Sequence, residues 1–473
     1  MSALAQQIEL ARSVACLGVA GQVLSSTGMT IQAAGLPIPV GSLCEVVTAP
    51  GRGLLAEVIG FRQGATLLMP LESMEGVARG QRVRHLTSSQ KVAVGPGLLG
   101  RVVDGMGRPY GDGEPILADT FYPLHCAAPD PYDRPRIDAP LSVGIRSINA
   151  LLTPGRGQRL GVFAAAGVGK SILLGMMARY TAADVTVIAL IGERGREVGD
   201  FLAKDLGPEG LKRSVVVVST SDQSPPLRMR ACFAATAIAE YFRDQGADVL
   251  LLMDSITRMA MAGRQIGLAA GEPPATKGYP PSVFAAMPRL LERCGRTPRG
   301  SITGMYTVLV EGDDLNEPVA DAARGILDGH IWLSRKLAAR GQYPAVSVLE
   351  SISRVMQDVV DAQHTAAAQK VRRLMAVWAE IEDLVNIGAY ATGTNAEFDL
   401  AIRVRPAIEA FLQQAVEEEL DFAASREGLL KLSELIDQTQ AAIAQKGGAA
   451  VSAAAQRQTA RPPRAAAPRG TKR

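Results

Sequence analysis

One stretch limits the fold of this chain more than any other, namely residues 159–180, R-L-G-V-F-A-A-A-G-V-G-K-S-I-L-L-G-M-M-A-R-Y. An apolar run is broken by Gly167-Val168-Gly169, and apolar residues at helical spacing follow Lys170-Ser171. This order predicts a strand, a glycine turn and a helix, which is the setting that a phosphate-binding loop requires. The alternative is a glycine hinge between a core strand and a helix, but Lys-Ser in register favours the phosphate loop.

Each part of this loop has an expected role toward a nucleoside triphosphate. Small residues let successive backbone N–H groups turn inward, and the helix N-terminus adds positive potential. Lys170 supplies a mobile positive charge, and the Ser171 hydroxyl can ligate Mg²⁺. Ala164 stands where the strict pattern has glycine, so its backbone must keep a negative φ. The expected nucleotide-binding residues of the loop are Ala164, Ala165, Ala166, Gly167, Val168, Gly169, Lys170, Ser171 and Ile172.

The composition suits an α/β core and argues against nucleic-acid binding. Aromatic residues make up 4% and hydrophobic residues 47% of the 473 residues, which favours a core rich in Ala, Val and Leu over an aromatic stacking surface. The net charge is +3, but six positive charges lie after Lys446, so the remainder is slightly acidic. The five cysteines lack a paired spacing and are expected to be reduced cytosolic thiols. The four histidines lack metal-binding spacing, and no apolar run is long enough to span a membrane.

The hydrophobic pattern divides the chain into five expected segments. Residues 1–13 are compatible with a short amphipathic helix, and residues 14–86 carry short β-rich runs between turns, which predicts a small antiparallel β-barrel. Strand-like and helical runs alternate over residues 87–360, which predicts a mainly parallel sheet with helices on both faces. Residues 361–446 show helical periodicity alone, and residues 447–473 have nothing to bury and are expected to be a disordered basic tail.

Helical stretches are expected within residues 361–446. The third runs from about Glu417 to Ala444, and its opening Glu417-Glu418-Glu419 is favourable at a helix N-terminus. The first is expected to bury one face, made of Val371, Leu374, Met375, Trp378, Ile381, Leu384 and Val385.

Charged residues follow two other strand-like runs. Asp254 ends the apolar run 249–253, and ligands of open α/β sheets gather at the carboxyl ends of strands. We expect Asp254 to hold Mg²⁺ through its water shell, with a helix N-cap as the alternative. Glu193 and Arg194 lie in I-G-E-R-G-R-E, where a carboxylate can orient water beside cations that face the γ-phosphate. A solvated charged turn is the alternative for this pair.

A family resemblance is carried by the motifs G-V-F-A-A-A-G-V-G-K-S, L-I-G-E-R-G-R-E-V, L-L-M-D-S-I-T-R and E-P-P-A-T-K-G-Y-P-P-S-V-F. These motifs closely resemble the flagellum-specific ATPase of the type III protein export apparatus, as do Y-T-V-L-V-E-G-D-D, I-L-D-G-H-I-W-L-S-R, Y-P-A-V and S-I-S-R. The resemblance covers roughly residues 14–414, and it extends more distantly to the nucleotide-binding subunits of rotary ATP synthases. It implies a β-barrel, a RecA-like P-loop NTPase domain and a helical domain.

The resemblance also implies individual roles in Mg²⁺-dependent ATP hydrolysis. Glu193 matches the carboxylate that activates the attacking water, and Arg194 beside it is expected near the γ-phosphate. Tyr343 matches an aromatic residue that packs on the adenine. Arg354 matches an arginine finger supplied to the nucleotide of the neighbouring subunit. Since each site is then completed by a neighbour, the resemblance implies a homohexameric ring.

The implied cellular role is a cytoplasmic ATPase at the inner-membrane export apparatus. Its implied partners are a stator-like regulator, a central stalk protein, the export gate and chaperone–cargo complexes. The implied task is to release cargo from chaperones and promote its delivery to the export gate. The same engine in a virulence injectisome is the nearest alternative, although residues 357–364 and 386–390 look more flagellar. A rotary synthase subunit is disfavoured because residues 376–390 lack an acidic lever sequence. An RNA translocase is disfavoured by the missing aromatic platform and the acidic folded part.

Two further stretches are given no catalytic role. The family commonly has A-Q-R-E after the Asp254 strand, whereas this chain has Ala262-Gly263-Arg264-Gln265 and lacks that carboxylate. The acidic stretch around Glu311, Asp313, Asp314 and Glu317 is expected to be a solvated loop and not a second metal site. The basic tail is expected to be drawn weakly, and in a salt-sensitive way, to anionic lipid or acidic partners.

Overall fold

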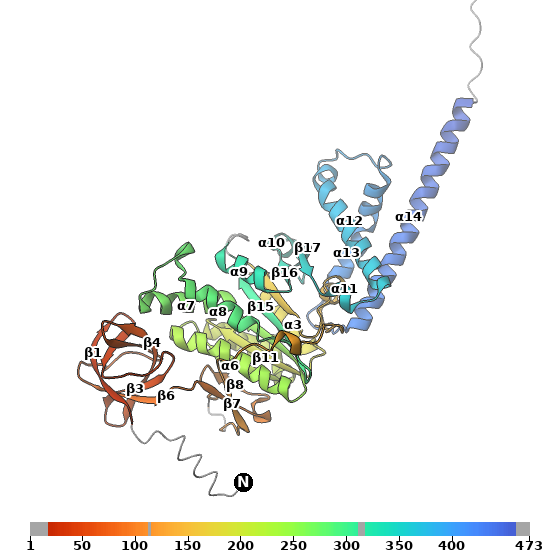
Figure 1. The fold of residues 1–473 in the computed structure, drawn as a ribbon. Coiled ribbons are helices and arrows are strands. Elements are labelled where there is room, and N and C mark those ends of the chain that lie inside the picture. The colour runs from red at the N-terminus through yellow and green to blue at the C-terminus, as the bar shows by residue number, and fades with distance from the viewer. Residues whose placement is uncertain (1–17, 112–114, 311–316, 460–473) are drawn as a thin grey trace, which may run out of the picture. The chain divides into compact units, whose positions relative to one another are not determined.

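The computed structural model of the chain describes residues 18–111, 115–310 and 317–459, and side chains as far as residue 445 (Figure 1). The chain forms two compact units. The first extends to Val360 and also contains Gln414–Phe422, and the second consists of Asp361–Gln413 and the chain from Ala423. The helix expected within residues 1–13 and the acidic residues Glu311, Asp313 and Asp314 lie outside the described residues.

The first unit begins with a closed six-stranded β-barrel, as expected for this part of the chain. Its strand order is β1-β2-β5-β4-β3-β6 and every neighbouring pair is antiparallel. Side chains alternate between the inside and the outside, so Ile31, Val46 and Val83 share one buried cluster. Closure leaves no strand edge open for pairing with other chains. The strands are β1 (Ala20–Thr27), β2 (Thr30–Ala34), β3 (Leu43–Ala49), β4 (Arg52–Arg62), β5 (Ala65–Pro70) and β6 (Arg82–Thr87).

The centre of the first unit is a nine-stranded, mostly parallel sheet, which confirms the expected fold class. Its order is β17-β16-β10-β15-β13-β11-β12-β8, with β14 beside β15. Only β14 and β17 run antiparallel to their partners. All seven residues of β11 are buried, as both-face coverage requires. The strands are β8 (Val102–Asp104), β10 (Arg159–Ala164), β11 (Val185–Ile191), β12 (Ser214–Ser219), β13 (Asp248–Asp254), β14 (Gly295–Arg296), β15 (Ser301–Leu309), β16 (Gly329–Leu333) and β17 (Val346–Ser353).

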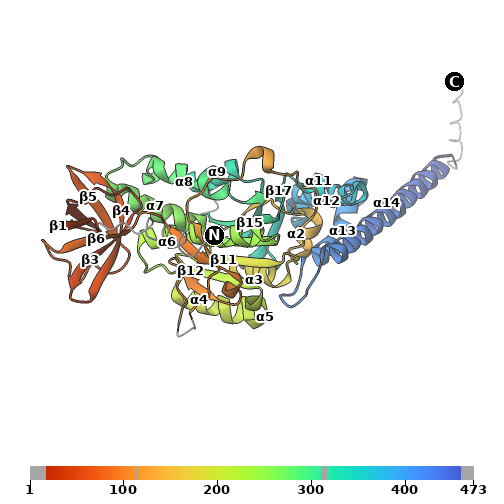
Figure 2. The same cartoon turned by 60° about the horizontal axis from the view of Figure 1, so that its bottom comes forward.

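Helices cover both faces of this sheet. Because crossovers between parallel strands are right-handed, connections that move toward β8 lie on one face and those that move toward β17 lie on the other. Figure 2 shows α4 and α5 on one side of the sheet and α8 and α9 on the other. The helices between its parallel strands are α3 (Lys170–Tyr180), α4 (Gly195–Asp200), a π-helical turn (Phe201–Leu206), α5 (Gly207–Lys212), α6 (Pro225–Asp244), α7 (Ile256–Ala270), α8 (Pro281–Leu291) and α9 (Pro318–Ile326).

Smaller elements complete the first unit. They are the two-stranded sheet β7 (Lys91–Val94) with β9 (Thr120–Pro123), the helices α2 (Arg146–Leu151), α10 (Arg335–Ala339) and α11 (Met356–Val359), and the 3₁₀ turns Pro96–Leu98, Pro131–Asp133 and Thr276–Gly278.

The second unit is helical, as expected, and contains α12 (Ala362–Asn386), α13 (Ala396–Leu412) and α14 (Phe422–Thr459). Asp361 caps α12 by accepting a hydrogen bond from the His364 N–H at 2.7 Å. The expected apolar face is buried at Val371, Leu374 and Ile381, but Leu384 is 45% exposed. That last turn of α12 therefore contributes less to the core than the periodicity predicts.

The start of the last helix differs from the sequence expectation. Residues 417–419 lie outside α14, which begins at Phe422. They belong to a segment held by the first unit, where Arg146 pairs with Glu418 and the Gln414 side chain donates to Gly144 O at 2.8 Å. These tertiary contacts outweigh the local tendency of the acidic residues to begin a helix.

The end of the last helix also differs from the expectation of disorder from Gly447. The backbone stays helical through Thr459. The stretch is rich in alanine, the residue with the highest intrinsic helix propensity, and the first prolines come later, at Pro462 and Pro463. The rest of the expected tail lies outside the described residues. Within residues 18–111, 115–310 and 317–459, no helix combines the length and apolar character needed to cross a bilayer.

Candidate active site

The predicted phosphate loop leaves the carboxyl end of β10 and enters α3. Gly167 and Gly169 have φ angles of 81° and 87°, in the left-handed region that L side chains rarely adopt. Gly169 is the residue that precedes the first turn of α3, so the loop requires this conformation to place backbone N–H groups at the helix N-terminus. In the part of the chain that the structure describes, Gln63 and Lys277 are the only non-glycine residues with positive φ, so Ala164 meets the requirement stated for it.

The loop presents a rim to solvent over a buried base, so its outer residues are accessible to a ligand. The rim residues Ala166, Gly167, Ser171 and Ile172 are exposed, whereas Ala164, Ala165 and Val168 are buried.

Lys170 lies between two carboxylates. Its Nζ atom is 2.5 Å from Asp254 Oδ1 and 3.6 Å from Glu193 Oε1. The three side chains are at most 15% exposed. The structure therefore brings together Lys170, Glu193 and Asp254, which come from the starts of α3 and of the turn after β11 and from the end of β13. One ammonium group faces two carboxylates, so the cluster carries excess negative charge around a mobile cation.

Asp254 is held so that one carboxylate oxygen stays available. Thr307 Oγ1 donates to Asp254 Oδ1 at 2.7 Å, and Lys170 donates to the same oxygen. Oδ2 accepts no hydrogen bond from any described residue. A hard oxygen of this kind, with the exposed Ser171 hydroxyl, fits Mg²⁺, which keeps several waters and takes few protein ligands. Among residues 18–111, 115–310 and 317–459, no group of three or more His, Cys, Asp or Glu side chains could hold a metal ion.

Glu193 has the environment expected of a catalytic base. Burial raises the pKa of its carboxyl above the usual value, and the Asp254 charge raises it further, while Lys170 and Arg258 act in the opposite direction. A raised pKa makes a carboxylate a stronger proton acceptor. The Glu193 backbone carbonyl accepts from Ser221 N at 3.0 Å, which ties the turn after β11 to the end of β12.

Arg194 is not brought to this cluster. Its guanidinium is 77% exposed and pairs with Glu197 at 3.2 Å, one turn further along α4. The arginine that neighbours Glu193 is Arg258, whose side chain packs against Gly192: a Cβ at Gly192 would lie 3.1 Å from Arg258 Cβ. Arg258 Nε is buried and donates to no described atom. Arg258 thus offers an unused donor beside Glu193, in the position expected for Arg194.

Sequence reasoning passed over Arg258 although the signal for it was present. It lies four residues after Asp254, inside L-L-M-D-S-I-T-R. Ser255 caps α7 by accepting from Arg258 N at 3.3 Å, so Arg258 lies in the first turn of a helix that starts at the carboxyl edge of the sheet. The order of strand, cap and helix therefore predicts that Arg258 lies at the carboxyl end of the sheet, as Asp254 does.

Tyr343 lies beside the phosphate loop. A Cβ at Gly169 would be 3.4 Å from Tyr343 Cε1, and the tyrosine side chain is 46% exposed. The Tyr343 carbonyl accepts from Gln414 N at 3.1 Å, which fixes the backbone. The ring is therefore placed next to the loop with a free surface on which a flat ligand group can pack.

Arg354 lies at the amino end of the parallel strands, and Lys170 lies at their carboxyl end. β17 is antiparallel to β16, with Val346 opposite Leu333 and Ser353 opposite Gly329. Leu333 is in register with Ala164, where β10 meets the phosphate loop. Arg354, directly after Ser353, is separated from the loop by at least the length of β10, roughly 16 Å at about 3.3 Å per residue. Its exposed side chain cannot serve the site of its own chain.

Three family descriptions match successive parts of the chain. The β-barrel domain of the ATP synthase alpha/beta family matches residues 22–86, and the nucleotide-binding domain of that family matches residues 144–353. The T3SS EscN ATPase C-terminal domain matches residues 360–431.

Proteins of two related systems are similar over most of the chain. The flagellum-specific ATP synthase of Bacillus subtilis is 52% identical, covering 84% of this chain and 91% of that protein. The type 3 secretion system ATPase of Xanthomonas euvesicatoria is 50% identical, covering 86% and 93%. The structure of the assembled ATPase EscN from the type III secretion system of enteropathogenic E. coli has a TM-score of 0.82 and 44% identity, covering 87% and 100%. EscN in complex with its central stalk EscO has a TM-score of 0.81.

Proposed function

The chain belongs to the family of flagellum-specific and type III secretion ATPases, related to the ATP synthase alpha/beta family, and from this premise we propose that it hydrolyses Mg²⁺-bound ATP in a homohexameric ring that energises flagellar protein export. It is an ATPase of that family. The observation that carries the chemical proposal is the cluster of Lys170, Glu193 and Asp254 beside an exposed phosphate loop.

In the proposed reaction, Lys170 leaves Asp254 and follows the β- and γ-phosphates. Its long flexible side chain already reaches two carboxylates, so exchanging one anionic partner for another requires no backbone movement. Asp254 Oδ2 and the Ser171 hydroxyl would hold Mg²⁺, which neutralises phosphate charge when bound. Tyr343 would pack on the adenine.

Glu193 orients the attacking water and accepts its proton. Arg258 donates to the γ-phosphate from the same edge of the sheet, which is the role that the sequence assigned to Arg194. Arg354 of a neighbouring subunit completes the site, since in its own chain it lies at the far edge of the sheet. Charge that develops on the transferred phosphoryl group then meets cations from two chains.

The proposed place of this activity is the cytoplasmic side of the export apparatus. There the ring would dock to a stator-like regulator, a central stalk protein and the export gate, and release cargo from chaperones for delivery to the gate. The solved structure of EscN with its central stalk EscO supports the stalk as a partner class.

Swimming of a strain that lacks its own flagellar export ATPase tests this role. We expect the wild-type chain, and not Glu193→Gln, to restore swimming and export of flagellar proteins. The type 3 secretion relatives favour one other candidate, the injectisome ATPase. Restored injectisome secretion without restored swimming would assign the chain to that branch and contradict the flagellar proposal.

The basic residues after Lys446 suggest a weak membrane attraction. Arg457, Arg461, Arg464, Arg469, Lys472 and Arg473 carry six positive charges without acidic residues between them. Each basic residue near an anionic surface is worth roughly 1 kcal/mol and is screened by salt. Truncation after Lys446 should leave ATPase activity intact and reduce co-sedimentation with anionic vesicles at low salt. Equal sedimentation of both forms would remove this proposal.

A further inference from the structure

Four hydrogen bonds hold the backbone and the neighbouring side chains at the base of Arg354. The Arg354 N–H donates to Asp328 O at 3.1 Å. Gln158 Nε2 donates to Ser353 Oγ at 3.0 Å and to Asp328 O at 3.3 Å. Ser353 Oγ in turn donates to Thr153 O at 3.1 Å. The residue before Arg354 and the carbonyl that accepts from Arg354 are therefore held by the same glutamine. Gln158, Ser353 and Asp328 are called the finger anchor below.

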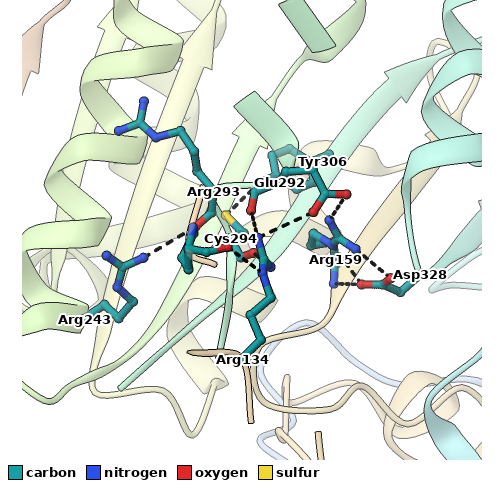
Figure 3. A network of polar contacts seen from close by, with 9 residues as sticks. Arg134, Arg159, Arg243, Glu292, Arg293, Cys294, Tyr306 and Asp328 are labelled. Atoms are coloured by element: carbon teal, nitrogen blue, oxygen red, sulfur yellow. Dashed lines mark hydrogen bonds and ion pairs between the residues drawn. The ribbon is translucent and has the colours of Figure 1, made fainter. Parts of the chain in front are cut away.

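The Asp328 side chain is locked as firmly as its carbonyl. Arg159 Nε and Nη2 donate to the two carboxylate oxygens, each at 3.0 Å, and Arg159 N donates to Oδ2 at 3.0 Å. A bidentate pair of this kind fixes direction as well as distance. Figure 3 shows Arg159 between Asp328 and Glu292, and Glu292 Oε1 lies 2.5 Å from Arg159 Nη1. Burial opposes the charge of Arg159, but its bonds to the two carboxylates outweigh burial and raise its pKa.

The anchor is buried, whereas the group that it carries is not. Gln158 is fully buried, and its Oε1 accepts from Gly155 N at 2.9 Å. The Arg354 side chain is exposed and makes no hydrogen bond or ion pair with the described residues. Three buried or half-buried polar residues therefore support the backbone of one exposed guanidinium that has no hydrogen-bond or ion-pair partner among the described residues.

We propose that Asp328, locked by Arg159, and Gln158 are positioning residues for Arg354, holding its backbone where the guanidinium can enter the active site of the next subunit. This inference rests on the proposed transfer of Arg354 into that neighbouring site. A catalytic group misplaced by about 1 Å can cost up to roughly 10²-fold in rate. The anchor acts on turnover in the neighbouring site and leaves nucleotide binding in its own site unchanged.

The variant that tests the anchor is Asp328→Asn. It keeps the backbone carbonyl and the size of the side chain but removes the anionic oxygen from the Arg159 fork. We expect rings that assemble and bind a fluorescent ATP analogue as the wild type does, with turnover lowered by roughly 10- to 10²-fold. Asp248→Asn is the matched control, because it removes the carboxylate of the Arg156–Asp248 ion pair at the same edge of the sheet. Its turnover should stay within about twofold of the wild type, because the Asp248 carboxylate, 23% exposed against 27% for Asp328, bonds to Arg156 and Ser301 and to no residue of the finger anchor.

Mixed rings separate a finger defect from a defect in the variant's own site. Lys170→Ala subunits lack a working phosphate loop but supply an intact finger, so mixing them with Asp328→Asn should raise activity above both parents. Mixing Asp328→Asn with Arg354→Ala should not, because neither subunit then supplies a working finger. The proposal would be overturned if activity rose in the mixture with Arg354→Ala and not in the mixture with Lys170→Ala. Wild-type turnover of Asp328→Asn would overturn it as well.

Two controls keep the outcome decisive. The reference mixture of Arg354→Ala with Lys170→Ala contains no anchor variant, so failure of that mixture rejects the shared site itself and not the anchor. If Asp328→Asn does not assemble, Ser353→Ala carries the same test, because it removes the hydroxyl that Gln158 holds. The same pattern of mixing supports the anchor, and full turnover of assembled Ser353→Ala rings overturns it.

Discussion

The two ends of the parallel sheet use charged residues in opposite ways. At the carboxyl end, one ammonium, that of Lys170, faces the carboxylates of Asp254 and Glu193 at 2.5 and 3.6 Å. At the amino end, Arg159 has two carboxylate partners of its own, and the buried Arg293 donates to Glu240 Oε1 at 2.8 Å.

The difference separates groups that await a ligand from groups that support the backbone. Excess negative charge and a cation with alternative partners keep the carboxyl end responsive to phosphate and Mg²⁺. At the amino end, the paired charges hold strands in place and leave Arg354, the proposed finger, exposed. β10 joins the two ends, since it begins at Arg159 and ends at the phosphate loop.

The broadest effect, on ATP binding as well as hydrolysis, is expected at the carboxyl end, from Lys170→Ala. No other described ammonium contacts both Asp254 and Glu193, so loss of this cation should abolish measurable ATP hydrolysis and weaken ATP binding. Loss of a single preorganised charge-stabilising donor costs roughly 10²–10³-fold in turnover in other enzymes. Steady-state phosphate release and titration with a fluorescent ATP analogue measure the two effects. Hydrolysis at more than a tenth of the wild-type rate would contradict the role of Lys170.

A separate loss of turnover is expected from Glu193→Gln. The amide keeps the size of the side chain but cannot accept a proton from water, so ATP should bind while hydrolysis falls by roughly 10²–10⁴-fold. Single-turnover hydrolysis with saturating enzyme measures the chemical step directly. Arg194→Gln is the control at the next residue and should change this rate little, because its guanidinium is exposed. A wild-type rate for Glu193→Gln would remove Glu193 from the mechanism.

The amino end should respond in stability more than in rate. Arg293→Met leaves the buried carboxylate of Glu240 without its partner, and breaking such a pair costs about 3–5 kcal/mol in the free energy of unfolding. Urea unfolding measures this, and folded protein should keep near-normal turnover. Arg296→Met removes a more exposed pair, Arg296–Asp138, and should cost at most about 1 kcal/mol. Equal losses in the free energy of unfolding for Arg293→Met and Arg296→Met would contradict the proposed distinction between buried ion pairs that support the fold and exposed ion pairs that do not.

The fold and the loop could be predicted because their signals are local. The glycine turn with Lys170 and the apolar strand ending at Asp254 each lie within one short run of sequence, and the structure brings these two residues together. The barrel could be predicted in kind from its short β-rich runs, whereas its closure by pairing of β1 with β6 is a long-range contact that no local run determines.

The remaining differences come from contacts that cross the chain. Arg194 and Arg258 look alike as arginines beside strand ends, and only packing decides that Arg258 lies against Gly192 while Arg194 pairs with Glu197. The late start of α14 depends on Arg146, far away in the sequence. The position of Arg354 at the far edge of the sheet follows from the antiparallel pairing of β17, which periodicity does not determine.

The activity of mixed rings tests the central claim, that one active site is built from both ends of the sheet in two different chains. Arg354→Ala keeps an intact phosphate loop, and Lys170→Ala keeps an intact finger, so some interfaces in a mixed ring contain both. A trans finger contributes roughly 10³–10⁵-fold in other phosphoryl-transfer systems, so each parent should be nearly inactive. The account predicts that co-assembled rings hydrolyse ATP well above either parent. If mixed rings form and their activity equals the sum of the parents, or if Arg354→Ala alone is near wild type, the shared site is contradicted.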